Sequence, residues 1–414
     1  MSRDNFVIDR QTLRALIGPM ADPGRLVGLE AEVLDHLPVN LRPLAAFRIA
    51  QAGLPETGRS GSGRTILRAA TVAWMRRRSA IRTLTSTLEQ AGLEAILLKG
   101  AALAMDVYPE PALRTMQDID LWMQPDRLDP AVRALEAVGF RCPDRVVTGV
   151  PDSRVPTRIL EWPSSPILVE LHGVPFSLSG LPGTVRDAMW RRRVPVNGEI
   201  RASLLRRDDL LLHLCLHAVR HHRLNGGLGA LADVGWVVAR GLDRPWSEWV
   251  DGVHTARAAT SVWLVLHLAR RWVGAPIPDQ VLAHLTPAEH ADRLLVLADR
   301  QLAAPGQEFR SAVERLLSDD AVSLARWVGG RFIAAPWRTA DRTGTGTGPR
   351  VIRGARLMLT DAAVKVGQYL RPRSRGGHVS LLQRFRLARE RGRLSRLLER
   401  MDRRATASST KPPG

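Results

Sequence analysis

The hydrophobic pattern changes twice along the chain, and its first part is helical. Between residues 65 and 91, apolar side chains recur mostly at spacings of three and four, which places them on one face of a helix. A stretch rich in glycine and serine, residues 57–63, precedes this helix and predicts a flexible break. The pattern therefore predicts a helical N-terminal region over residues 1–92.

From residue 93 the pattern is that of a small α/β unit. Short apolar runs bounded by turn residues predict buried strands, and helical spacing predicts two short helices between them. The Asn197-Gly198 dipeptide between two short strands predicts a β-hairpin. The strands are expected at 94–98, 118–123, 158–162, 167–172, 194–196 and 200–202, and the helices at 101–107 and 130–138. Residues 93–205 are therefore expected to form the core domain.

Beyond residue 206 the chain is helical again, and then it becomes low in complexity and basic. Helical apolar spacing runs through 210–224, 228–239, 246–258, 261–273 and 288–302. These segments predict a helical domain over 206–337, which a flexible linker follows at 338–349. Residues 350–414 are expected to form basic C-terminal helices and a tail. The predicted fold class is α+β, with helical regions before and after the core.

The net charge of +19, from 60 basic and 41 acidic residues, is concentrated at the C-terminus. Residues 371–414 contain 13 basic and 3 acidic residues. Such an arginine-rich tail attracts polyanions, whether nucleic acid, acidic lipid headgroups or an acidic partner, and charge alone does not choose among them. A solvated tail without a partner fits the same composition.

Cysteine content and apolar run length indicate the compartment. Cys142 and Cys215 are too few for a disulfide framework or a cysteine zinc site. No apolar run reaches the length of about 18 residues that a transmembrane helix needs. The first ten residues lack the apolar core of a signal peptide. We therefore expect a cytoplasmic protein, and the excess of arginine over three lysines indicates a bacterial source with a GC-rich genome.

Asp118 and Asp120 are the first candidates for chemistry. They lie two residues apart in a predicted strand, so that both side chains point to the same side. Two like charges on an apolar strand are costly unless a cation neutralises them, and oxygen ligands suit Mg²⁺ or Mn²⁺. Without a metal, replacing either residue by Asn is expected to relieve repulsion and to leave the fold intact or more stable. The alternative is a strand edge with two solvated aspartates.

Two other segments favour a site for a metal and a nucleotide. Glu170, in the predicted strand 167–172, can complete a cluster of three carboxylates that is suited to two-metal chemistry. Lys99 and Gly100 lie in a turn between a strand and a short helix, where glycine lets the backbone approach a phosphate and the helix N-terminus attracts anions. Lys99 is also the only lysine in the first 364 residues, which favours a phosphate contact.

These segments together resemble a known family. The motifs are L-L-K-G-A-A-L, Y-P, L-R-T-M-Q-D-I-D-L, a Gly-Phe pair after a helix, and V-E-L-H, all between residues 94 and 175. They resemble the uncharacterised bacterial nucleotidyltransferase family of the polymerase-β-like superfamily. The likeness continues more loosely through L-L-H-L-C-L-H-A and A-L-A-D-V-G-W-V-V. It does not extend to the N-terminal helices or the basic tail.

The resemblance implies a small mixed β-sheet nucleotidyltransferase core and gives roles to individual residues. The catalytic and metal-binding carboxylates that it implies are Asp118, Asp120 and Glu170. Gly100 matches the turn glycine that approaches the nucleotide phosphates, with Lys99 and Ala101 beside it as nucleotide-binding residues. Ala101 stands where the superfamily usually has a serine that touches a phosphate.

Three further polar residues in or after these motifs each have two interpretations. Arg114 either binds the triphosphate or orients the aspartates through a bidentate contact, or it is an ordinary loop arginine. His172 faces the same side as Glu170 and either donates a hydrogen bond to the carboxylates or is a satisfied core histidine. Asp233 lies in an apolar segment and needs a structural partner, either a histidine or an arginine.

Several histidines lie on one predicted helix. His213, His217 and His221 share a helix face, but no H-E-x-x-H pattern or cysteine pair accompanies them. We therefore expect this helix to pack on the core, with His217 near the nucleotide, and we do not predict a zinc site.

The predicted function is Mg²⁺-dependent transfer of a nucleoside monophosphate from a nucleoside triphosphate to an acceptor, with release of pyrophosphate. The acceptor stays open among small molecules, peptides, proteins and RNA, because the metal cluster contacts only the triphosphate and one acceptor oxygen. The alternative is a non-catalytic nucleotide- or RNA-binding module that retains the same fold.

Overall fold

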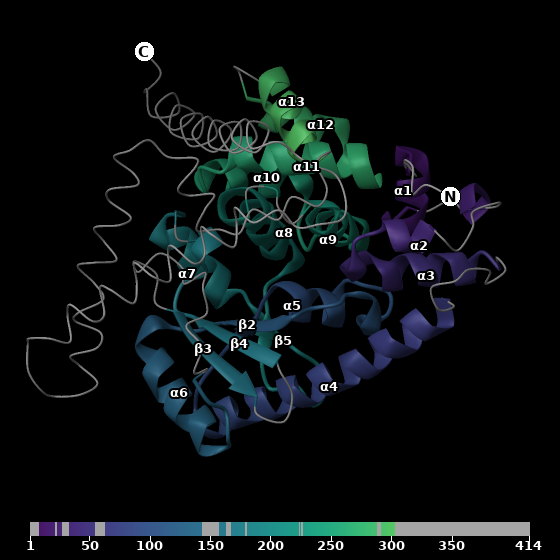
Figure 1. Ribbon diagram of the computed structural model, residues 1–414. Helices are drawn as coiled ribbons and strands as arrows, with labels where there is room; N and C mark the ends of the chain where they lie inside the picture. Colours follow the sequence, from purple (N-terminus) through teal and green to yellow (C-terminus); the bar gives the residue numbers. More distant parts are fainter. Residues whose placement is uncertain are drawn as a thin grey trace, which may run out of the picture. The chain divides into compact units, whose positions relative to one another are not determined.

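The computed structural model describes most of the first 302 residues (Figure 1). The described ranges are 8–20, 23–26, 33–53, 63–142, 157–162, 167–178, 180–222, 224, 227–287 and 291–302. All of them belong to one compact unit. The predicted linker at 338–349, the basic region at 350–414 and residues 303–337 of the predicted helical domain lie outside the described residues.

The described N-terminal residues are mainly helical, as the apolar spacing predicts. The α-helices are α1 (Arg10–Ile17), α2 (Val33–His36), α3 (Arg42–Gln51) and α4 (Gly63–Gln90). Helix α4 buries Ile81, Leu84 and Leu88 at helical spacing and packs against α3. Most of the predicted break at 57–63 lies outside the described residues, and α4 begins at its last residue.

The core is a mixed β-sheet of six strands. The strands are β1 (Ile96–Leu97), β2 (Asp118–Trp122), β3 (Thr157–Trp162), β4 (Ile167–His172), β5 (Val194–Pro195) and β6 (Ser203–Leu204), in the order β3-β4-β2-β1-β6-β5. Strand β2 is parallel to β4 and antiparallel to β1, and β1 is parallel to β6. Alternate residues of the adjacent strands β2 and β4, Ile119, Leu121, Val169 and Leu171, are fully buried. The predicted α+β fold, with a small mixed sheet between helical regions, is confirmed.

The hairpin around Asn197-Gly198 forms, but its loop is longer than predicted. Strands β5 and β6 are antiparallel and pair Val194 with Leu204. The second strand therefore begins after residues 200–202, because Val196 N–H donates to Ala202 C=O at 2.9 Å and closes the loop between them. Gly198 has a φ of +93°, a backbone conformation that glycine adopts without steric cost.

Helices cover both faces of the sheet. Helices α5 (Lys99–Asp106), α6 (Leu128–Ala137) and α7 (Gly183–Arg191) alternate with the strands, and six more follow them. These six are α8 (Arg207–Leu216), α9 (Gly227–Arg240), α10 (Trp246–Thr255), α11 (Ala259–Val273), α12 (Asp279–Leu285) and α13 (Ala291–Leu302). Figure 1 shows α4 and α6 on one side of the sheet and α8 and α9 on the other. In the described part of the chain, no helix is long and apolar enough to cross a membrane.

Candidate active site

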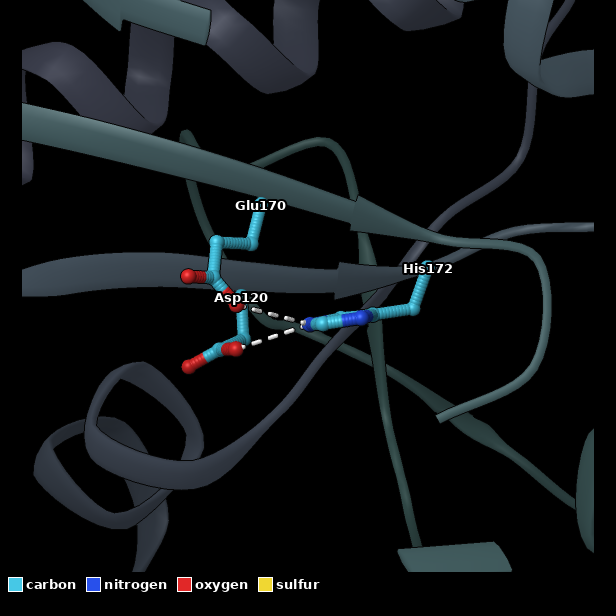
Figure 2. Close-up of side chains that lie close together, drawn as sticks. All are labelled: Asp120, Glu170 and His172. Carbon is cyan, nitrogen blue, oxygen red and sulfur yellow. Dashed lines mark hydrogen bonds and ion pairs between the residues drawn. The ribbon is translucent and has the colours of Figure 1, made fainter. Parts of the chain in front are cut away.

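The polar side chains of the site come from two adjacent parallel strands. In the register of β2 and β4, Asp120 is paired with Glu170 and Trp122 with His172. Residues that are paired in this way point to the same face of the sheet. Figure 2 shows the side chains of Asp120, Glu170 and His172 converging on one point. The structure thus places the candidate Glu170 beside Asp120, on the strand that the V-E-L-H pattern predicts.

Asp120 is the most buried carboxylate of the group, with only 2% of its surface exposed. Its Oδ1 atom accepts a hydrogen bond from Lys99 Nζ at 2.6 Å and one from His172 Nε2 at 2.9 Å. The same His172 nitrogen lies 3.4 Å from Glu170 Oε2. His172 therefore contacts both carboxylates, which is the first of the two interpretations that its sequence position allows.

The electrostatic environment of Asp120 differs from that of the other two carboxylates, Asp118 and Glu170. Burial raises the pKa of Asp120, but the adjacent charge of Lys99 and the hydrogen bond from His172 outweigh burial and hold this pKa below its ordinary value. Burial raises the pKa of Asp118, and the negative charge of Asp120 raises it further. Burial and the charge of Asp120 raise the pKa of Glu170 in the same way. Among these three carboxylates, Asp120 is the one whose pKa the neighbouring positive groups hold below its ordinary value, whereas at Asp118 and Glu170 burial and repulsion outweigh them.

The geometry fits a divalent metal ion. Asp120, Glu170 and His172 each offer one ligand atom, and all three atoms lie within 4.8 Å of one another. The ammonium group of Lys99 lies against Asp120, and the same carboxylate would also stabilise a bound cation. Asp118, which shares a strand with Asp120 but does not belong to this group of three, lies close enough to interact electrostatically with Asp120 and Lys99. Carboxylate oxygens suit Mg²⁺ or Mn²⁺, so the residues fit the metal that the sequence predicts.

The Lys99-Gly100-Ala101 turn begins helix α5. Lys99 has a φ of +47°, which is uncommon for a residue other than glycine. A Cβ atom on Gly100 would lie 2.8 Å from Met116 Cβ, so glycine is needed for close packing as well as for any phosphate contact. Ala101 is buried, at 1% exposure. The first amide groups of a helix lack intrahelical acceptors, which leaves those of this turn suited to a phosphate.

Arg114 forms a bidentate ion pair with Asp233 of α9. Its Nε and Nη2 atoms donate to the two carboxylate oxygens at 2.6 and 2.8 Å, and Tyr108 Oη donates to Asp233 Oδ1 at 2.8 Å. The prediction that Asp233 has a structural partner is confirmed. Burial opposes the charge of Arg114, but Asp233 outweighs burial and raises the arginine pKa above its ordinary value. Arg114 Nη1 also lies 3.6 Å from the position that a Cβ atom on Gly100 would take, so this arginine links α9 to the turn. The predicted contact of Arg114 with the triphosphate stays a prediction.

Breaking this ion pair is expected to destabilise the fold. In Asp233→Asn, the buried guanidinium of Arg114 loses its counter-ion, and the loss of a buried partner typically costs about 3 kcal/mol or more. Chemical denaturation measures the change in free energy of unfolding. The matched control is Asp129→Asn, which breaks an exposed pair with Arg158 and is expected to cost less than about 1 kcal/mol. Equal costs in the two variants would contradict a structural role for Asp233.

Two further polar residues near the carboxylates have no signal in the sequence. Arg77 of α4 interacts electrostatically with Asp118, and its buried Nε atom has no hydrogen-bond partner among the residues that the structure describes. Arg77 stands among three successive arginines of a long helix, so the sequence pattern does not distinguish it. Ser177 lies in a short 3₁₀ turn and contacts His213 Nδ1 through its Oγ atom at 2.9 Å.

Several histidines cluster at the end of α8 and in the turn that follows it. His213 is fully buried, and burial lowers its pKa to about 3, with Lys99 and Asp120 also acting on it. Its ring stacks on that of His217, whose ring is in edge contact with His222. The α-helical face predicted for His213, His217 and His221 is not continuous, because α8 ends at Leu216 and residues His217–His221 form a π-helical turn. The side chain of His221 lies outside the described residues.

The structure brings together a D-x-D strand, a carboxylate on the adjacent parallel strand and a glycine turn at the start of a short helix, which are the features that the motif resemblance implies. The sequence profile of the uncharacterised nucleotidyltransferase family matches residues 40–274, which is more than half of the chain, and the chain belongs to this family. The resemblance found in the motifs is thereby confirmed. The match begins at residue 40, so it also includes α3 and α4, which the motif resemblance does not reach. No curated protein and no solved structure matches the chain significantly.

Proposed function

We propose that this protein is a metal-dependent nucleotidyltransferase that moves a nucleoside monophosphate from a nucleoside triphosphate to an acceptor. The observation that carries the proposal is the convergence of Asp120, Glu170 and His172 on adjacent strands, with Lys99 against Asp120. An acceptor oxygen attacks the α-phosphorus, the bond between the α-phosphorus and the bridging oxygen breaks, and pyrophosphate leaves. The family assignment supports this class of reaction.

Each site residue has a role in this proposal. Asp118, Asp120 and Glu170 would hold Mg²⁺ or Mn²⁺. The bound ion would neutralise the triphosphate and lower the pKa of the acceptor hydroxyl. Catalysis then consists mainly of positioning and charge neutralisation, as in other phosphoryl transfers.

The basic turn supplies the phosphate contacts in this proposal. When a cation and a triphosphate bind, Lys99 exchanges its contact with Asp120 for a contact with the phosphates. The amide groups of Gly100 and Ala101, at the positive end of α5, lie next to the same phosphates. Arg114 supports this turn from its place between Asp233 and Gly100.

A second candidate is a nucleotide- or RNA-binding module without turnover. Ala101 favours it, because the serine hydroxyl that the superfamily usually offers to a phosphate is missing. The arginine-rich tail also favours it through its attraction for polyanions. The first candidate binds a nucleoside triphosphate, and the second binds a nucleotide or RNA. The acceptor of the first candidate is a small molecule, a peptide, a protein or RNA.

Pyrophosphate release distinguishes the two candidates. The full-length protein is incubated with nucleoside triphosphates, Mg²⁺ or Mn²⁺ and each class of acceptor, and pyrophosphate is measured with a coupled assay. We expect release that depends on both metal and acceptor and that is lost in Asp120→Asn. Triphosphate binding without pyrophosphate release from any acceptor class would favour the binding module.

A further inference from the structure

The imidazole of His172 lies against both carboxylates of the site. Its Nε2 atom lies 2.9 Å from Asp120 Oδ1 and 3.4 Å from Glu170 Oε2. Ligand atoms that bind one ion at about 2.1 Å and at right angles to each other lie about 3.0 Å apart. The two distances from Nε2 are therefore close to those between neighbouring ligand atoms around one ion, and the three ligand atoms all lie within 4.8 Å of one another. Figure 2 shows the ring edge directed between the two carboxylates.

The other nitrogen of the ring has a partner that favours this arrangement. Thr157 of β3 is the register partner of His172, and its Oγ1 atom lies 3.4 Å from Nδ1. A histidine that binds a metal through Nε2 carries its proton on Nδ1 and donates it to a neighbouring acceptor. Thr157 offers that acceptor, and the side chain of His172 is buried, with 7% of its surface exposed.

We propose that His172 is a direct metal ligand, so that the site holds its ion with one imidazole nitrogen as well as with carboxylate oxygens. This inference rests on the metal site of the proposed function and deepens it. Imidazole suits first-row transition ions, whereas Mg²⁺ takes oxygen ligands. The site therefore favours Mn²⁺ over Mg²⁺. A His172 that only donated a hydrogen bond to Asp120 would leave an all-oxygen site without this preference.

Electron spin echo spectroscopy of bound Mn²⁺ tests the inference directly, because it detects the ¹⁴N nucleus of a coordinated imidazole. In the full-length protein we expect one nitrogen coupling, and in His172→Gln we expect the coupling to disappear. The ratio of Mn²⁺ to Mg²⁺ affinity is expected to fall about tenfold in the variant. His254→Gln, which changes an exposed histidine of α10, is the matched control and is expected to keep both properties.

Thr157→Val is a second variant, which leaves the ligand in place. It is expected to keep the nitrogen coupling and to weaken Mn²⁺ binding about tenfold, since the Nδ1–H group loses its acceptor. Bound Mn²⁺ without nitrogen coupling in the wild-type protein would overturn the role of His172. If this Mn²⁺ is nevertheless lost in Asp120→Asn, the proposed function remains intact. A wild-type protein that binds no Mn²⁺, with or without a triphosphate, would contradict both.

Discussion

Replacing Asp120 by Asn is expected to lower nucleotidyl transfer by about 10³-fold or more, because the central negative charge of the metal site is removed. Asp120 is the carboxylate on which Lys99 and His172 converge, and it is buried at 2% exposure. The amide of Asn has nearly the same shape but cannot neutralise a cation. Calorimetry of Mn²⁺-triphosphate binding measures the loss independently of the acceptor. Unchanged affinity in Asp120→Asn would contradict the site.

The same substitution at Asp118 serves as a comparison. Without a bound metal, the two substitutions are expected to change the free energy of unfolding differently. Asp120→Asn leaves the ammonium of Lys99 without its partner and is expected to cost about 3 kcal/mol. Asp118→Asn removes a charge that burial and Asp120 already disfavour, so it is expected to be neutral or stabilising. The sequence alone predicts relief of repulsion at both positions. The contacts of Asp120 with Lys99 and His172 lead us to revise that expectation for Asp120.

The pH dependence of this difference follows from the direction of the pKa shift of Asp120. Its pKa in the folded chain is lowered, so its contribution to stability is present at neutral pH and is lost as pH falls below the unfolded value of about 4. Asp118 has a raised pKa in the folded chain, and the cost of its charge disappears as pH falls. The stability gap between the wild-type protein and Asp120→Asn is therefore expected to shrink under acid conditions. Chemical denaturation of chelator-treated protein at pH 7 and at about pH 2 measures it, because the contribution of Asp120 is lost only as pH falls from the unfolded pKa toward the lower folded pKa.

Replacing Lys99 by Met is expected to tighten Mn²⁺ binding about tenfold in the absence of nucleotide, because the lysine charge competes with the ion for Asp120. Lys99 Nζ lies 2.6 Å from Asp120 Oδ1. The same variant is expected to weaken Mn²⁺-triphosphate binding about tenfold, since the phosphates lose a positive charge. Titration calorimetry with and without a non-hydrolysable triphosphate separates the two effects.

Lys99→Arg is the matched control for this prediction, because it keeps the charge and changes its shape. Its affinity for Mn²⁺ alone is expected to stay close to that of the wild-type protein. If Lys99→Met and Lys99→Arg have equal affinities for Mn²⁺ alone, the charge of Lys99 does not compete with the ion.

The strands that carry the carboxylates could be predicted from the sequence, because alternation within a strand is a local property. The spacing of Asp118 and Asp120 and the V-E-L-H pattern place β2 and β4 correctly to within about one residue. Helix α7 was not predicted, because Met189 is its one fully buried residue among the described positions and its apolar stripe is weak. Helix α12 was not predicted because it is only seven residues long.

The partners of the charged side chains could not be predicted, because they depend on tertiary structure. Arg114 and Asp233 are 119 residues apart in the chain, and no local pattern brings them together. Lys99, which contacts Asp120, has a backbone φ of +47°, which the sequence pattern does not indicate for a lysine. The proximity of Arg77 to Asp118 likewise follows from how α4 packs on the sheet.

The position of the label in the triphosphate tests the central claim most directly. The full-length protein is incubated with Mn²⁺ and a cell extract, once with triphosphates labelled at the α-phosphorus and once with triphosphates labelled at the γ-phosphorus. We expect transfer of the α-label to an acceptor, release of the γ-label as pyrophosphate, and loss of both in Asp120→Asn. Transfer of the γ-label to the acceptor, or α-label transfer that Asp120→Asn leaves unchanged, would contradict nucleotidyl transfer at this site.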